Sequence, residues 1–312
     1  MTIDELRRFG AETLRRESLE RGEPEVTDGT CVLEADLLLG HVLSCRREAL
    51  VMRRNQTPVE GPLEGNAEKR FRELVSRRAA GEPIAYLLGK KEFHSLDFIV
   101  SPAVLIPRPE TELLVERALA HFSRDKKPSL LIDIGTGSGA VLLSVLHEIR
   151  RVHGEIFLQD LLAIGSDISR EALEIACRNA EQLGLRKYVQ FVRSDFLSAF
   201  ALEEKAESLK VIVCNPPYIP HRAILSHDVK AYEPHQALFA GEDGLSAIRT
   251  LVAQSYPQPP SGALGLINLA IILEVGAEQA EKVRCLFLDS GARDVAIHRD
   301  LRGIDRVVEI LS

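Results

Sequence analysis

The run Asn215-Pro216-Pro217-Tyr218 follows the apolar segment 211–214, and its residue types suit chemistry on a planar amino group. The two prolines remove amide donors and fix the backbone, which leaves rigid carbonyl acceptors beside the Asn215 side chain. These acceptors can hold both hydrogens of an NH₂ group, favour a pyramidal nitrogen and turn its lone pair toward an electrophilic methyl. Tyr218 can cover the flat group from one face. These four residues are therefore the candidate catalytic and substrate-binding residues.

A glycine-rich turn follows the apolar segment 130–134 and leads into an expected helix. Glycines allow a sharp turn and let a ligand approach the free amides at the helix start. The turn fits S-adenosylmethionine, but Gly135, Gly137 and Ala140 also satisfy the dinucleotide fingerprint. The candidate cofactor-binding residues of this segment are Asp133, Gly135, Thr136, Gly137, Ser138 and Gly139.

Acidic residues end the next two expected strands. Asp167 can accept both ribose hydroxyls of an adenosine, or it can cap the helix that follows. Asp195 can bind the adenine amino group while Phe196 stacks on the ring, or the pair can serve capping and packing alone. Hydride transfer has no use for the rigid prolyl turn at Asn215. The glycine-rich turn and Asp167, together with the prolyl turn at Asn215, therefore favour S-adenosylmethionine over a nicotinamide dinucleotide.

Strand-like and helical segments alternate after residue 128, which predicts an α/β domain with a mostly parallel sheet covered on both faces. The segments 294–298 and 306–311 have no helix between them and predict a terminal antiparallel hairpin. The other expected strands are 130–134, 161–164, 189–192, 211–214 and 264–273, and the expected helices are 140–151, 170–183, 245–253 and 278–288.

The chain before residue 81 predicts a small helical bundle. Thr2 and Glu5 form a capping box at the first helix, and 66–80 predicts a later one. The side chains expected to face the core of this bundle are Val32, Leu33, Leu37, Leu38, Val42, Leu43, Phe71, Leu74 and Val75.

Domain boundaries follow from these patterns. Residues 84–104 predict a short β-hairpin, because Tyr, Phe, Ile and Val are interrupted by Gly and Ser. We therefore expect a helical substrate-recognition domain at 1–83, a hairpin linker at 84–108 and a catalytic domain at 109–312.

The length, charge and cysteine content limit which classes of protein are possible. A length of 312 residues suggests two domains, and a net charge of -7 argues against broad nucleic-acid binding. The five cysteines are scattered and form no Cys-x-x-Cys pair, so we expect buried reduced thiols and no metal site. The charged N-terminus and the lack of a long apolar run predict no signal peptide and no membrane span. We expect a cytoplasmic monomer.

Asn-Pro-Pro-Tyr after an Asp-x-Gly-x-Gly-x-Gly strand resembles amino methyltransferases that act on adenine, guanine or glutamine nitrogens. From Arg78 onward the chain resembles, more narrowly, the HemK/PrmC family of release factor glutamine methyltransferases. The runs that carry this resemblance are 78–89, 92–93, 105–112, 233–234, 237–238, 241–245, 273–276 with Gln279, and 300–303 with Arg306.

The resemblance implies a Rossmann-like class I methyltransferase domain with a seven-stranded sheet, preceded by a helical domain. It implies methyl transfer from S-adenosylmethionine, which becomes S-adenosylhomocysteine, to the N5 amide of the Gly-Gly-Gln glutamine of peptide chain release factors. It further implies that Gly135–Gly139, Asp167, Phe196 and Asn215 contact the cofactor and that Asn215–Tyr218 hold the glutamine. The segment 106–112 is expected over the cofactor at the domain junction, without a catalytic role.

The chain departs from the family pattern at 152–160 and 262–270, both away from the expected site. Four alternatives stay open at this point. They are an adenine or guanine amine methyltransferase, a ribosomal-protein glutamine methyltransferase, a nicotinamide oxidoreductase and an inactive binding module.

Overall fold

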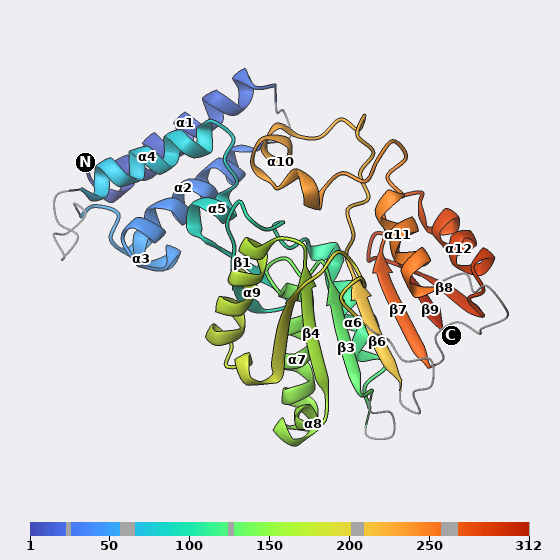
Figure 1. Ribbon diagram of the computed structural model, residues 1–312. Helices are drawn as coiled ribbons and strands as arrows, with labels where there is room; N and C mark the ends of the chain where they lie inside the picture. Colours follow the sequence, from blue (N-terminus) through green and yellow to red (C-terminus); the bar gives the residue numbers. More distant parts are fainter. Residues whose placement is uncertain (23–25, 57–65, 124–127, 201–208, 257–267, 312) are drawn as a thin grey trace. The chain divides into compact units, whose positions relative to one another are not determined.

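The computed structural model describes residues 1–22, 26–56, 66–123, 128–200, 209–256 and 268–311. The chain divides into two compact units. The first consists of residues 1–89 with 225–232, and the second of residues 90–224 with 233–312. The first unit is helical, and the second contains the large sheet (Figure 1).

The capping box predicted at the start of the first unit is confirmed. The Thr2 hydroxyl accepts the Glu5 amide at 3.2 Å, and the Glu5 carboxylate accepts the Thr2 amide at 2.8 Å. Phe71 and Val75 are buried as expected, and Leu74 is half-buried. The helices of this unit are α1 (Ile3–Glu20), α2 (Asp28–Val42), α3 (Arg47–Met52), α4 (Ala67–Ala79), α5 (Ile84–Leu88) and α10 (His227–Tyr232).

The apolar face predicted for α2 is partly wrong, because Val32, Leu33 and Leu37 are exposed. Their exposure follows from helical geometry, since the face that meets the core has positions separated by three or four residues. That face includes a cysteine and an alanine. A prediction based only on large apolar residues does not include these two small side chains. The buried members of this face are Cys31, Ala35, Leu38, Leu39 and Val42.

The predicted hairpin begins later than residue 84. Residues Ile84–Leu88 form helix α5, which ends at Gly89 in the left-handed conformation, with a φ of 69°. The hairpin itself pairs β1 (Lys90–Phe93) with β2 (Leu96–Ile99). It belongs to the second unit, where Phe93 and Phe98 are buried in the core.

Within the described residues, the second unit has a seven-stranded sheet of order β5-β4-β3-β6-β7-β9-β8. The strands β5, β4, β3, β6 and β7 pair with one another in parallel, and β9 is antiparallel to both β7 and β8. This confirms the predicted sheet and terminal hairpin. The strands are β3 (Leu130–Ile134), β4 (Leu162–Asp167), β5 (Val189–Arg193), β6 (Lys210–Cys214), β7 (Leu269–Glu274), β8 (Asp294–Arg299) and β9 (Asp305–Leu311).

Two predicted features fall partly outside the described residues. The strand expected at 264–273 is β7 from Leu269 onward, and 264–267 lie outside the described residues. The same holds for 262–267 of the unusual segment 262–270. The other unusual segment, 152–160, is described and is mostly helical, with α7 (Ala140–His153) ending in it and α8 covering Glu155–Gln159.

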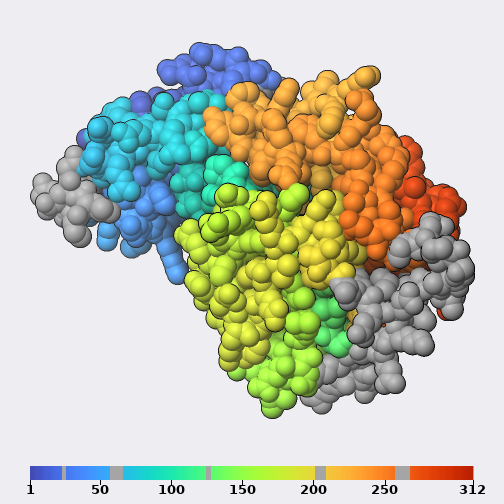
Figure 2. Space-filling view, in the orientation of Figure 1, coloured from blue at the N-terminus to red at the C-terminus, as the bar shows by residue number. Residues whose placement is uncertain are grey.

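Helices cover both faces of the sheet. Side chains alternate along a strand, so Leu131 of β3 packs with one layer of helices and Ile132 with the other. Figure 2 shows the same side as Figure 1 with side chains drawn, and atoms in the yellow-green and yellow of the chain after β4 cover much of the area where Figure 1 shows separate strands. The first layer contains α6 (Glu112–Leu119), α7 (Ala140–His153), α8 and α9 (Arg170–Gln182), and the second contains α11 (Ser246–Ser255) and α12 (Ala280–Asp289).

Two further expectations concern the whole chain. None of the helices in the described ranges has the length and apolar character needed to cross a membrane. Cys31 and Cys214 are buried as expected, and Cys45 and Cys177 are half-buried. Cys285 is exposed, so the expectation of buried thiols is wrong for Cys285. Its position on the outer side of α12 explains the exposure.

Candidate active site

The strand register brings the predicted site residues to one edge of the sheet. Ile134 of β3 pairs with Ser166 of β4 and with Cys214 of β6. The residue after each of these is Gly135, Asp167 or Asn215. Carboxyl ends of parallel strands are where ligands bind in open α/β sheets, and the three candidate motifs start there.

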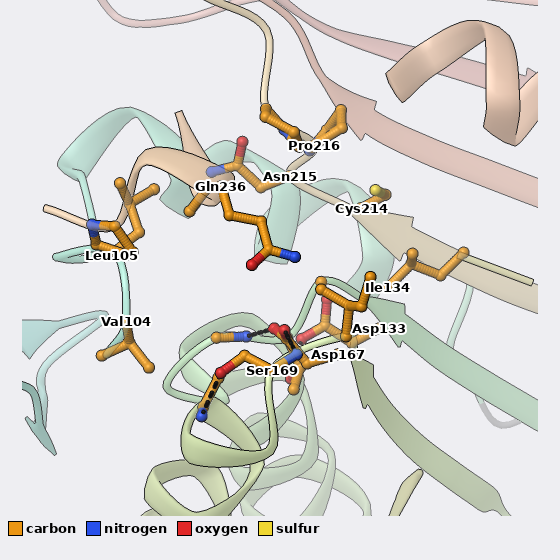
Figure 3. Close-up of a pocket in the computed structure, with 18 of the residues that line it drawn as sticks. Val104, Leu105, Asp133, Ile134, Asp167, Ser169, Cys214, Asn215, Pro216 and Gln236 are labelled. Atoms are coloured by element: carbon orange, nitrogen blue, oxygen red, sulfur yellow. Dashed lines mark hydrogen bonds between the residues drawn. The ribbon is translucent and has the colours of Figure 1, made fainter. Parts of the chain in front are cut away.

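These strand ends line a cavity of about 560 Å³ in the second unit. Figure 3 shows Asp133 and Asp167 on one side of it and Asn215 and Pro216 on the other. Gly139 and Tyr218 lie next to the cavity but do not line it. The predicted residues that do line it are Asp133, Gly135, Thr136, Gly137, Ser138, Asp167, Asp195, Phe196, Asn215, Pro216 and Pro217.

The glycines of the turn after β3 are required by its backbone. Gly135, Gly137 and Gly139 have φ angles of 68°, 54° and 80°, in the left-handed region that disfavours a side chain. Gly139 is the N-cap of α7 and makes no side-chain cap, and in the first turn of this helix the Leu142 amide bonds the Asp133 carboxylate. Amides at a helix start suit a polar or anionic ligand group.

Two carboxylates hold this turn, the buried Asp133 and the half-buried Asp167. Asp133 accepts the Thr136 hydroxyl at 2.7 Å, and burial raises the pKa of Asp133 to about 7. Asp167 accepts the Gly137 amide at 3.0 Å and the Ser169 amide at 2.9 Å, and burial raises its pKa also. The side-chain cap of α9 comes from Ser169, whose hydroxyl accepts the Ala172 amide at 3.1 Å. Capping of α9 therefore does not explain why an aspartate is present at position 167.

Asp195 and Phe196 line the cavity beyond β5. Phe196 has a φ of 49°, and its carbonyl accepts the Ser194 hydroxyl at 2.8 Å. This local bond helps hold an unusual backbone conformation for an aromatic residue. The arrangement places an acid and a ring side by side at the cavity wall.

Two residues behind the Asn215 turn, Thr111 and Glu274, were not predicted as part of the site. The Asn215 amide donates to the Thr111 hydroxyl at 3.3 Å, and that hydroxyl donates to Glu274 at 2.6 Å. Tyr218 donates its hydroxyl to the other oxygen of Glu274 at 3.2 Å. Burial raises the pKa of both Glu274 and Tyr218. One signal was present, because Glu274 ends β7 just as Asp167 ends β4.

The backbone of Tyr218 is fixed by a third residue that was not predicted as part of the site, Gln279. Gln279 donates to the Tyr218 carbonyl at 3.0 Å and accepts the Gly276 amide at 3.0 Å. Gly244 leaves room for this carbonyl, since a Cβ at Gly244 would lie 2.3 Å from the oxygen. The main chain after the two prolines is thus held in place by tight packing.

The segment before α6 closes one side of the cavity through Pro107, Arg108 and Thr111. Its anchor is Glu233, a buried carboxylate that pairs with Arg108 and accepts the Ile106 amide at 3.3 Å. The segment 106–112, expected to lie over the cofactor, thus forms part of the cavity wall.

Asn179 of α9 makes a further connection to the turn. Its side-chain amide donates to the carbonyls of Ile99 at 3.0 Å and Ser138 at 2.8 Å, and its oxygen accepts the Ile99 amide at 2.7 Å. One fully buried carboxamide therefore joins hairpin strand β2 to the glycine-rich turn.

Comparison with known proteins decides the family. Residues 25–89 match the PrmC N-terminal domain, and residues 112–223 match an RMKL-like methyltransferase domain. A release factor glutamine methyltransferase of Bradyrhizobium diazoefficiens is 37% identical, over 98% of this chain and 94% of that protein. One of Coxiella burnetii is 40% identical, over 88% of this chain and 90% of that protein. The chain belongs to the release factor glutamine methyltransferase family.

Family membership makes the chain a methyltransferase and confirms the resemblance found in its motifs. The alternative of a nicotinamide oxidoreductase, based on the glycine-rich turn alone, is therefore wrong. The class of fold is confirmed as well. The solved hMettl16 catalytic domain, in complex with MAT2A 3′UTR hairpin 6, superimposes with a TM-score of 0.52 at 15% identity, over 77% of this chain and 82% of that one.

Proposed function

We propose that the protein transfers a methyl group from S-adenosylmethionine to the N5 amide nitrogen of the glutamine in the Gly-Gly-Gln motif of peptide chain release factors. One observation carries the proposal. The prolyl turn at Asn215 and the glycine-rich turn with Asp167 line opposite sides of one cavity. A planar amide held at one side thus faces a nucleoside ligand held at the other. The names of the curated relatives give release factors as the substrates of those proteins.

The residues present fit S-adenosylmethionine. The volume of about 560 Å³ is within the range of small-molecule sites. The Asp167 oxygens accept the Gly137 and Ser169 amides, and a carboxylate has about four acceptor positions in all, which leaves room for ribose hydroxyls. When bound, S-adenosylmethionine supplies an electrophilic methyl on its sulfonium and leaves as S-adenosylhomocysteine. The residues assigned to hold it are Asp133, Gly135, Thr136, Gly137, Ser138, Gly139, Asp167, Asp195, Phe196 and Asn215.

The Asn215 turn acts on the substrate amide. The Asn215 side-chain oxygen and the Pro216 carbonyl accept its two hydrogens, so the nitrogen lone pair is freed for direct in-line transfer. Pro217 keeps the turn rigid and the Tyr218 ring covers the amide. No covalent enzyme intermediate is required: the nitrogen–methyl bond forms as the sulfur–methyl bond breaks, and the nitrogen then gives up one hydrogen to water as a proton. The Tyr218 hydroxyl is no base here, since its pKa is raised and it donates to Glu274.

Mass spectrometry tests the proposal directly. Purified full-length release factor is incubated with the enzyme and S-adenosylmethionine, and the Gly-Gly-Gln peptide is analysed. We expect a gain of one methyl, located on the glutamine side chain. A release factor whose glutamine is replaced by glutamate is the control and gains none. A methyl found only in nucleic acid or in a ribosomal protein would overturn the proposal in favour of that substrate.

A further inference from the structure

The Glu274 carboxylate is connected to both ends of the Asn215–Tyr218 turn, directly to Tyr218 and through Thr111 to Asn215. One oxygen accepts the Thr111 hydroxyl at 2.6 Å, and Thr111 in turn accepts the Asn215 amide at 3.3 Å. The other oxygen accepts the Tyr218 hydroxyl at 3.2 Å. We propose that Glu274, acting through Thr111, sets the orientation of the Asn215 carboxamide and is a positioning residue for methyl transfer. This inference rests on the proposed function.

The direction of each hydrogen bond follows from the carboxylate. An ionised carboxylate only accepts, so the single proton of the Thr111 hydroxyl is used in the bond to Glu274. The Thr111 oxygen then has only lone pairs to offer Asn215. It must therefore face the NH₂ group of Asn215 and not the carbonyl oxygen. The Asn215 oxygen is left on the other branch of the carboxamide, free to accept a hydrogen from the substrate amide.

Burial makes this arrangement selective. Glu274 is 1% exposed and Thr111 is 4% exposed, so water does not compete for their hydrogen bonds. The side chain of an asparagine is nearly symmetric in shape, and only hydrogen bonding distinguishes its two orientations. In the flipped orientation the Asn215 carbonyl oxygen would face the Thr111 oxygen. Neither atom would then have a hydrogen to donate to the other, so this orientation is disfavoured. The network therefore selects the orientation that catalysis needs.

Protonation of Glu274 would reverse the relay. A neutral carboxyl can donate to the Thr111 oxygen, which frees the Thr111 proton for the Asn215 oxygen and stabilises the flipped carboxamide. The titratable groups that interact with Glu274 are Tyr218, Cys214, Arg306 and Glu110, and among them the positive charge of Arg306 favours ionised Glu274. Activity should thus require ionised Glu274, with kcat decreasing on the acid side as this group takes up a proton.

Isosteric variants test the relay. Thr111→Val keeps the shape and removes the hydroxyl, whereas Thr111→Ser keeps the hydroxyl. We expect Thr111→Val to lower kcat roughly 10- to 100-fold with little change in the affinity for S-adenosylmethionine, and Thr111→Ser to restore kcat to near wild type. Glu274→Gln should lower kcat similarly and lose the acid limb of the pH profile, because its amide can donate to Thr111 at every pH.

A double-mutant cycle separates positioning from general destabilisation. If Thr111 acts through Asn215, adding Thr111→Val to Asn215→Ala lowers kcat no further. Additive losses, or equal kcat for Thr111→Val and Thr111→Ser, would overturn the relay. Urea unfolding shows whether each variant is folded. If Glu274→Gln does not fold, the comparison of Thr111→Val with Thr111→Ser still tests the relay. Absence of any release factor methylation by the wild type would instead overturn the proposed function.

Discussion

The backbone amide of Gly137 donates to the Asp167 carboxylate at 3.0 Å, which connects the turn after β3 directly to the end of β4. The carboxylate at the second strand thus shapes the glycine-rich turn as well as presenting its own oxygens to the cavity. Ligand binding and the conformation of the turn therefore depend on the same side chain.

Replacing Asp167 should weaken cofactor binding. Asp167→Asn removes the negative charge and one of the two acceptor oxygens, so we expect the Kd for S-adenosylmethionine to rise roughly 10- to 100-fold. Isothermal titration calorimetry measures this change. The matched control is Asp289→Asn, an exposed acid at the end of α12, which should leave the Kd unchanged. Equal affinities for wild type and Asp167→Asn would remove Asp167 from the cofactor site.

Asn215 should matter mainly for the chemical step. Asn215→Ala removes an acceptor for the substrate amide, and we expect kcat to decrease about 10²- to 10³-fold, or ~3 kcal/mol of transition-state stabilisation. Single-turnover methylation at saturating S-adenosylmethionine isolates this step. Asn55→Ala, at an exposed position of the first unit, is the control. Near-wild-type turnover of Asn215→Ala would contradict the assigned role.

A methyl group at Gly244 should disturb the prolyl turn. Its φ of +75° disfavours alanine, and the added Cβ would lie 2.3 Å from the Tyr218 carbonyl oxygen. Gly303 has a similar φ of +78° with no atom within 4 Å of its virtual Cβ. Gly303→Ala should therefore lose only the backbone contribution, about 1–2 kcal/mol of unfolding free energy, whereas Gly244→Ala should lose more and also lower kcat. Urea unfolding and initial rates compare the two, and equal effects would show that the Tyr218 contact is unimportant.

Asp133 should make the stability of the free enzyme depend on pH. Burial raises its pKa from 3.8 to about 7, so the folded state binds this proton more tightly than the unfolded state. Stability then falls as pH rises between these two values and levels off above the folded one. Between about pH 5 and about pH 8 the loss from this group is about 2–3 kcal/mol. Asp133→Asn does not titrate, so its unfolding free energy in urea should decline less over this range. Parallel curves for the two proteins would show that Asp133 does not contribute.

Local patterns predicted the parts of the site that lie within one strand and its following turn. Gly135, Gly137 and Gly139 mark left-handed backbone positions, and Asp167 and Asn215 each follow an apolar strand. Parallel pairing then brings these segments together without further information. The same logic predicted the order of strands and helices in the second unit.

Sequence patterns could not identify residues that act from distant parts of the chain. Thr111 and Glu274 meet across 163 positions, and Ile106 meets Glu233 across 127. No local spacing links such partners, because only the folded sheet edge and its covering segments bring them together. Exposure on α2 was mispredicted for a related reason, since large side chains were counted while the small residues Cys31 and Ala35 define the buried face.

The three hydrogen bonds of Asn179 have a consequence for amide hydrogen exchange. Ile99 does not line the cavity, yet its amide proton is held by the same side chain that holds the Ser138 carbonyl. Opening of the hairpin at Ile99 must therefore loosen the turn, and a ligand that orders the turn opposes this opening. Exchange of the Ile99 amide with deuterium should slow when S-adenosylmethionine is added, so a proton outside the cavity reports on its occupancy.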